Sequence, residues 1–172
     1  MVKKLEMQIY PAPILQQRTE EVSAEELSNP EFAQLFLDMQ ETMKDHDGIG
    51  LAAPQIGKSI RFTIIKTEDG ILPLVNPRVV RRSIAKDIME EGCLSIPGVY
   101  GDVKRSKSIK VITQDMAGKE IRFTAKGMFA RVIQHEVDHL NGVLFIDKAI
   151  KINEGQEILD KMNIKFPLTI GC

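Results

Sequence analysis

The first clear pattern along the chain is a helical repeat of apolar residues that follows Asn29 and Pro30. Its members recur at steps of three and four residues and are Phe32, Leu35, Phe36, Met39 and Met43. This spacing predicts an amphipathic helix that ends before Gly48. Asparagine followed by proline is typical of a helix start. Ser23 and Glu26 have the spacing of a capping box, which indicates another helix start just upstream.

The middle of the chain changes to short apolar runs that are rich in β-branched residues and predict strands. We predict these strands over residues 61–66, 71–75, 79–82, 108–114 and 120–124. Asp69 and Gly70 suit a tight turn between the first two strands, and residues 115–118 suit a turn between the last two. Because a second helix follows these strands, the order of elements predicts an α+β fold.

The second helical pattern runs from Met128 to Asn141. At about 100° per residue, its apolar side chains cover one half of the helix circumference. The polar residues that fall opposite are Arg131, Gln134, Asp138 and Asn141. Glu136, in contrast, lies inside the apolar half. A carboxylate at an apolar position indicates a functional role.

Residues 135–139 read HEVDH, which is an HExxH pattern. Four helical residues turn through about 400°, so the imidazoles of His135 and His139 project within roughly 40° of each other and can share one metal ion. Glu136 is then placed to reach a metal-bound water, and burial would raise its pKa toward that of a general base. The alternative is that both histidines lie at the edge of the helix, hydrogen-bonded and without a metal, and that Glu136 is an ordinary surface residue.

A tetrahedral catalytic metal site usually takes three protein ligands and a water, so a third ligand is needed. Glu154 and Glu157 are candidates downstream of the helix, and Cys93 is the candidate upstream. We favour Cys93, because a thiolate is a strong ligand for soft and borderline metals and strands can fold back onto the helix. The alternative for Cys93 is an ordinary buried cysteine.

The segment from Gly48 to Gln55 reads GIGLAAPQ and follows the first long helix. Its small residues permit the close approach of another backbone, and Gln55 offers an amide donor to a developing oxyanion. A plain loop is the alternative. The segment is not a dinucleotide-binding fingerprint, because its glycines follow a helix and residue 53 is alanine where a third glycine would fall.

Composition narrows the class of protein. The 172 residues are 43% hydrophobic and 27% charged, which fits one globular domain over residues 1–172. The 23 basic and 24 acidic residues give a net charge of −1, so no basic excess favours nucleic-acid binding. The sequence begins without the apolar run of a signal peptide and has no membrane-spanning stretch, so we expect a cytoplasmic protein. In that compartment a disulfide between Cys93 and Cys172 is disfavoured.

Three motifs, in this order, resemble the signature motifs of peptide deformylases. They are GIGLAAPQ at residues 48–55, EGCLS at residues 91–95 and QHEVDHLNG at residues 134–142. The resemblance covers most of residues 10–150. It implies an α+β fold in which antiparallel β-sheets pack around a central helix that carries HExxH. It also implies the removal of formate from the N-formylmethionine of nascent proteins, here in the bacterial cytoplasm.

The resemblance assigns a role to each matched residue. The implied metal ligands are Cys93, His135 and His139. The implied catalytic groups are Glu136 as general base and acid, with Gln55 and the backbone N–H of Leu94 stabilising the oxyanion. The implied substrate-binding residues are Ile49, Gly50 and Gly92 along the peptide backbone, and Met89, Glu91, Met128 and Val132 around the methionine side chain. We further expect Glu91 to pair with Arg105.

The implied cofactor is one divalent metal ion, with Fe2+ expected in the cell and Zn2+ or another divalent ion able to use the same ligands. The expected partners are nascent N-formylmethionyl peptides, with transient contact with the ribosome and no membrane.

The tail matches the family less closely. Residues 153–162 predict a short helix, and residues 164–170 predict an extended apolar segment. Two rival hypotheses stay open from the sequence. One is an HExxH peptidase with Glu154 or Glu157 as the third ligand, and the other is a domain that binds metal only for structure or captures formylated peptides without turnover.

Overall fold

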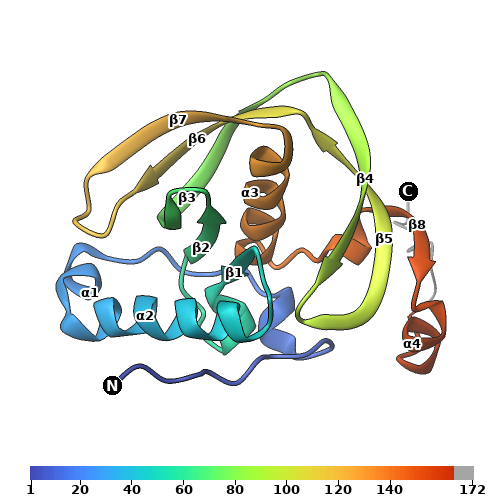
Figure 1. Ribbon diagram of the computed structural model, residues 1–172, viewed down its shortest axis with the longest axis horizontal. Helices are drawn as coiled ribbons and strands as arrows, with labels where there is room; N and C mark the ends of the chain where they lie inside the picture. The colour runs from blue at the N-terminus through green and yellow to red at the C-terminus, as the bar shows by residue number, and fades with distance from the viewer. Residues whose placement is uncertain (165–172) are drawn as a thin grey trace.

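Figure 1 shows the chain as a computed structural model that describes residues 1–164. The helices are α1 (Ala24–Ser28), α2 (Pro30–Asp45), α3 (Gly127–Leu140) and α4 (Gln156–Lys161), with short 3₁₀ turns at Pro13–Gln16, Ala53–Ile56 and Phe145–Asp147. The strands are β1 (Gly50–Ala52), β2 (Phe62–Thr67), β3 (Gly70–Arg82), β4 (Lys86–Cys93), β5 (Ile96–Ser106), β6 (Ser108–Gln114), β7 (Glu120–Lys126) and β8 (Ala149–Glu154).

The strands form two antiparallel sheets around α3. One sheet has the order β1-β2-β3-β6-β7, and the other has the order β4-β5-β8. Helix α3 lies between them and packs against strands of both sheets (Figure 1). The predicted α+β fold, with antiparallel sheets around a central helix, is therefore confirmed. This order leaves β1 at an edge of the first sheet and β4 at an edge of the second.

Helix α2 begins and packs as its sequence predicts. The Asn29 side chain accepts a hydrogen bond from the Glu31 N–H at 2.9 Å, and Pro30 opens the helix. The predicted capping box between Ser23 and Glu26 is also present and begins α1. The apolar face of α2 packs on β2 through Phe32, Met39 and Met43. Full burial of such side chains contributes roughly 1.5–3 kcal/mol each, so burial holds α2 against the sheet.

The strand prediction was incomplete. The segments predicted at 71–75 and 79–82 belong to the single strand β3, which pairs irregularly with β6. Strands β1, β4, β5 and β8 were missed. Strands β4 and β5 carry several charges and glycines in place of a clear apolar alternation, and their pairing with each other defines them as strands. Cross-strand pairing is a tertiary feature that a local pattern does not record.

The helix predicted over residues 153–162 begins later, at Gln156. Glu154 pairs with Tyr100 as part of β8, so this part of the prediction was wrong. Gly155 separates the strand from α4 because its φ of 81° lies in the left-handed region.

Three expectations concern the tail and the membrane. The extended segment predicted over residues 164–170 lies outside the described residues, apart from its first residue. Cys172 also lies outside them, and Cys93 is a free cysteine.

None of the described helices combines the length and the apolar character that a membrane crossing requires.

Candidate metal centre

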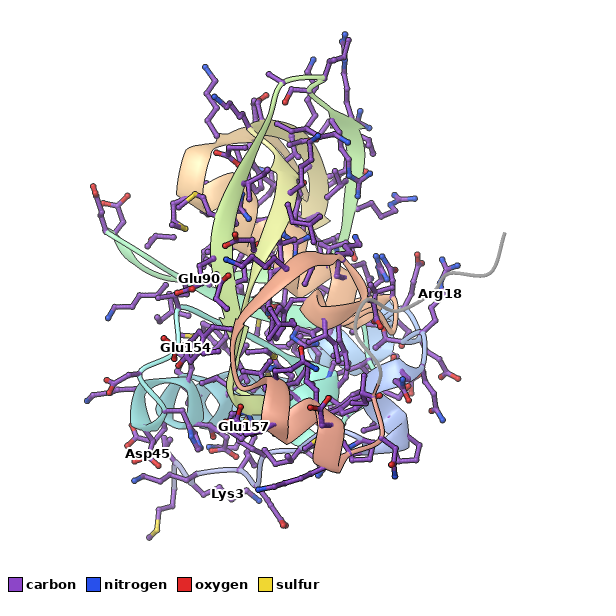
Figure 2. The ribbon with its side chains drawn as sticks, turned by 90° about the vertical axis from the view of Figure 1, so that its right-hand side faces the viewer. Lys3, Arg18, Asp45, Glu90, Glu154 and Glu157 are labelled. Carbon is purple, nitrogen blue, oxygen red and sulfur yellow. The ribbon has the colours of Figure 1, made fainter. Side chains whose placement is uncertain are left out.

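The structure brings three metal-ligating side chains together at one point. Cys93 lies at the end of β4, and His135 and His139 lie one turn apart on α3. The Cys93 Sγ is 3.2 Å from the His139 Nε2, and the donor atoms of all three residues lie within 4.8 Å of one another. Cys93 therefore completes the donor set, as the sequence favoured. Glu154 and Glu157 are exposed on β8 and α4, outside this group (Figure 2).

The donor set fits a divalent transition metal. One thiolate and two imidazoles suit zinc or iron by their softness. Burial alone would raise the pKa of the Cys93 thiol, but the adjacent imidazoles of His139 and His135 together outweigh this effect and lower that pKa to about 5. The sulfur is thus held as the thiolate that a metal requires. Within residues 1–164 this group has three protein donors, whereas a structural site is normally closed by four.

Glu91 links the metal centre to a buried ionic network. Its Oε2 lies 3.0 Å from the His135 Nδ1, and Arg105 binds both carboxylate oxygens at 2.6 and 2.8 Å. Burial would raise the pKa of Glu91, but Arg105 and His135 hold it well below its usual range. The predicted pair of Glu91 and Arg105 is present. A carboxylate on the second ring nitrogen fixes the orientation of a ligating histidine.

Sequence reasoning missed the polar side of α3 as part of this site. Arg131 and Asp138 fall opposite the apolar half of the helix, yet both are buried. Arg131 binds Glu91 and Asp87, each at 2.6 Å, and Asp138 binds Arg105 at 2.6 Å. These partners come from β4 and β5. The spacing of α3 alone gives no signal of their presence.

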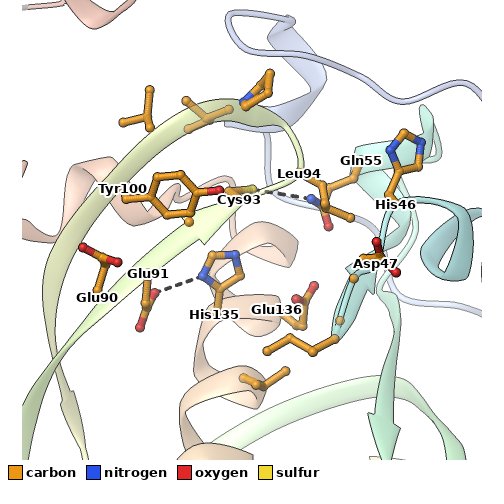
Figure 3. Close-up of a pocket in the computed structure, with 18 of the residues that line it drawn as sticks. His46, Asp47, Gln55, Glu90, Glu91, Cys93, Leu94, Tyr100, His135 and Glu136 are labelled. Carbon is orange, nitrogen blue, oxygen red and sulfur yellow. Dashed lines mark hydrogen bonds and ion pairs between the residues drawn. The ribbon is translucent and has the colours of Figure 1, made fainter. Parts of the chain in front are cut away.

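Glu136 is buried beside the donor set. It is 3% exposed, and the Thr63 hydroxyl lies 3.4 Å from its Oε2. Burial raises the pKa of Glu136, in the direction that the sequence predicted. Gly50 makes room for it, because a Cβ at position 50 would lie 2.3 Å from the Glu136 Oε1. Figure 3 shows Glu136 and His135 on neighbouring positions of α3, facing the pocket.

Gln55 is held so that its amide nitrogen faces the cysteine. Its Oε1 accepts a hydrogen bond from the Ala52 N–H at 2.9 Å. Its Nε2 then donates to the Cys93 Sγ at 3.5 Å and to the Ser95 Oγ at 3.3 Å. The segment that contains Gln55 forms β1 and a buried 3₁₀ turn, so it is an ordered element and not a plain loop.

A pocket of about 590 Å³ opens beside the donor set, between β1, β4 and α3. Eleven of the thirteen residues that the sequence and the resemblance single out line it: Ile49, Gly50, Gln55, Glu91, Gly92, Cys93, Leu94, Met128, Val132, His135 and Glu136. His139 is fully buried beneath it. Met89 is 37% exposed and is not part of the lining. It precedes Glu91 by two residues on β4, which places it about 7 Å further along the strand.

The pocket also has walls that the sequence did not indicate. His46 and Asp47 line it on the side of α2, and Tyr100 of β5 lines it on the other (Figure 3). Tyr100 packs against Gly92, where an added Cβ would lie 2.6 Å from the ring. No motif in the sequence pointed to these residues.

A cysteine and two histidines beside a buried carboxylate fit a metal-dependent hydrolase, in which the carboxylate serves as the base. The comparisons with known proteins agree. The family profile described as Polypeptide deformylase matches residues 4–155. The peptide deformylase of Halothermothrix orenii is 48% identical over 122 residues, which are 70% of this chain and 79% of that protein.

Solved structures give the same result. The crystal structure of peptide deformylase from Thermotoga maritima has a TM-score of 0.81 at 37% identity, over 85% of this chain and 97% of that one. A peptide deformylase from Synechococcus elongatus, in complex with actinonin, has a TM-score of 0.84 at 40% identity, over 94% of this chain and 87% of that one. The chain belongs to the polypeptide deformylase family and is a metallohydrolase.

Proposed function

We propose that this enzyme removes the formyl group from the N-formylmethionine of newly synthesised polypeptides and releases formate. The observation that carries the proposal is that the three donor side chains meet at one point, and that Cys93, His135 and the adjacent Glu136 line the pocket there. The family to which the chain belongs supports the same reaction.

Cys93, His135 and His139 would hold one divalent metal ion. We propose Fe2+ in the cell, with Zn2+ or another divalent ion able to bind the same donors. When bound, such an ion polarises a carbonyl oxygen and lowers the pKa of a coordinated water. Glu91 keeps the His135 Nδ1 engaged, so that the other ring nitrogen stays directed at the metal position.

Glu136 would move the proton. Its burial raises the pKa of the carboxyl group, so the carboxylate is a stronger base than an exposed glutamate. We propose that a Glu136 carboxylate oxygen takes a proton from the attacking water and returns it to the leaving amine. The close approach of Gly50 fixes where this carboxylate lies.

Gln55 and Leu94 would stabilise the negative charge that develops on the formyl oxygen. The Ala52 N–H fixes the Gln55 amide by its oxygen, which leaves the Nε2 pointed at the site. We propose that this Nε2 and the backbone N–H of Leu94 donate to the oxyanion. Donors that are already oriented need no rearrangement when the charge forms.

The peptide would bind as an added strand between the two sheets. Strands β1 and β4 are edge strands, and the pocket is lined by Ile49 just before β1, by Gly50 at its start and by Gly92 near the end of β4. Edge strands present unpaired N–H and C=O groups that an extended peptide can bind. The methionine side chain would enter between Glu91, Met128 and Val132. We place the reaction in the bacterial cytoplasm on nascent chains, with transient ribosome contact.

Formate release from a formyl-methionyl tripeptide tests the proposal. The protein is purified without oxygen, loaded with Fe2+, and compared with Glu136→Ala and with the control Glu157→Ala, which changes an exposed glutamate on α4. We expect rapid release by the parent and the control, and none by Glu136→Ala. A metal-loaded parent that releases no formate would contradict the proposed function.

A further inference from the structure

A second cavity lies apart from the pocket and has a basic lining. Its volume is about 490 Å³, and it shares no lining residue with the first pocket. Its charged lining residues are Arg82, Lys86, Lys104, Arg105, Lys148 and the single acid Asp147. They come from β3, β4, β5 and the turn before β8, so the cavity is assembled from segments far apart in sequence.

The positive charge of this cavity is a local feature. The whole chain has a net charge of −1, yet five basic residues and one acid line the cavity. The Asp147 carboxylate keeps its charge, and its Oδ2 accepts a hydrogen bond from the Leu144 N–H at 2.7 Å. The lining therefore has four more basic than acidic residues, although Arg105 and Lys148 are paired with acids outside the lining.

Three of these cations lack a protein partner. Arg82, Lys86 and Lys104 are exposed, and in residues 1–164 no acidic side chain pairs with any of them. Lys86 lies opposite Ser106, and Lys104 lies opposite Ile88, two residues along the same pair of strands. The two lysines thus share one face of β4 and β5 as diagonal neighbours. Like charges at such positions repel each other, and a bound anion would relieve that repulsion.

The inner end of the cavity is rigid. Arg105 is 4% exposed, and ion pairs with Glu91 and Asp138 fix its guanidinium. Lys148 is fixed by Asp138 at 2.6 Å. The described hydrogen bonds of Arg105 use three N–H groups, whereas a guanidinium carries five. The cavity lining therefore combines a rigid, ion-paired group with three exposed cations that have no acidic partner in residues 1–164.

We propose that this cavity binds the phosphate groups of a polyanionic ligand. Guanidinium and ammonium groups are the side chains that recognise phosphate oxygens, and five residues that carry them line this cavity. The volume is within the range of roughly 300–1,000 Å³ that is usual for small-molecule sites. A free oligophosphate and the backbone of an RNA strand offer the same phosphate chemistry.

Calorimetric titration of the metal-loaded full chain with sodium tripolyphosphate is the first arm of the test. The cavity variant carries Arg82→Gln, Lys86→Gln and Lys104→Gln. The matched control carries Lys58→Gln, Lys66→Gln and Lys119→Gln, which removes the same charge from exposed residues outside the cavity. We expect binding to the parent and the control, and binding weaker by about tenfold or more in the cavity variant, with a strong salt dependence.

The second arm uses a short fluorescent RNA duplex and measures its anisotropy with the same three proteins. Duplex binding that tripolyphosphate displaces and that the cavity variant loses assigns the phosphates to an RNA backbone. Tripolyphosphate binding without duplex binding assigns them to a free oligophosphate. If neither ligand binds, or if the cavity variant binds as well as the control, the proposal is overturned. Formate release by both triple variants checks that they are folded.

Discussion

The Nδ1 of His135 lies 3.0 Å from the Oε2 of Glu91, whereas the Nδ1 of His139 is buried with no hydrogen-bond partner among the described residues. The two imidazoles of the donor set are therefore held in different ways. His135 depends on a carboxylate that is itself fixed by Arg105 and Arg131. The orientation of one metal ligand thus rests on a network that extends across β4, β5 and α3.

We expect Glu91→Gln to weaken metal binding by roughly 10- to 100-fold, because it removes the charge that orients His135. A competition titration with a chelator measures this loss. Glu90→Gln is the matched control, since Glu90 is the exposed neighbour of Glu91 on β4. Equal metal affinity in Glu91→Gln and Glu90→Gln would show that the network does not support the metal centre.

We expect Gln55→Leu to lower the rate of formate release by about 100-fold or more, because it removes a donor to the oxyanion. Its metal content should stay that of the parent. Leucine also leaves the buried Ala52 N–H without its acceptor, so stability must be separated from catalysis.

Thermal unfolding of the metal-loaded Gln55→Leu variant makes this separation. We expect the variant to stay folded at the assay temperature, so that the lost rate reports the missing amide donor. Near-normal turnover in Gln55→Leu would remove Gln55 from the mechanism.

We expect Arg105→Ala to lower the free energy of unfolding by about 3–5 kcal/mol, because Glu91 and Asp138 would be left as buried charges without this partner. Urea unfolding measures the change. The control is Arg122→Ala, which breaks an exposed pair with Glu120 and should cost less than about 1 kcal/mol. Unchanged activity and stability in Arg105→Ala would refute the importance of the buried pair.

Asp38 should give the protein a pH-dependent part of its stability. Burial would raise the pKa of Asp38, but hydrogen bonds from the Lys3 N–H at 3.0 Å and the Gln34 amide at 2.8 Å lower it below its usual value of 3.8. A lowered pKa stabilises the fold above the unfolded-state pKa, and this contribution is lost as the pH falls through the folded-state pKa.

Urea unfolding of the parent and of Asp38→Asn tests this effect. We expect the parent to be the more stable protein at pH 6 and its advantage to shrink as the pH is lowered below about 3.8. An advantage that stays constant from pH 6 to pH 2 would argue against a role for the Asp38 charge.

The sequence by itself determined the features that depend on neighbouring residues. The start of α2 at Asn29 and Pro30 follows from local capping, and the common face of His135 and His139 follows from the pitch of one helix. These features involve residues at most a few positions apart, where backbone geometry alone sets the distance. The motifs also determined the family, which the comparisons confirmed.

The tertiary structure decided what depends on segments far apart in the chain. It brought Cys93 to His139 across 46 residues. It also buried the polar side of α3, which helical periodicity places opposite the apolar half. Arg131 and Asp138 can be buried because β4 and β5 supply charged partners for them, and the pairing register of those strands is not written in any local pattern.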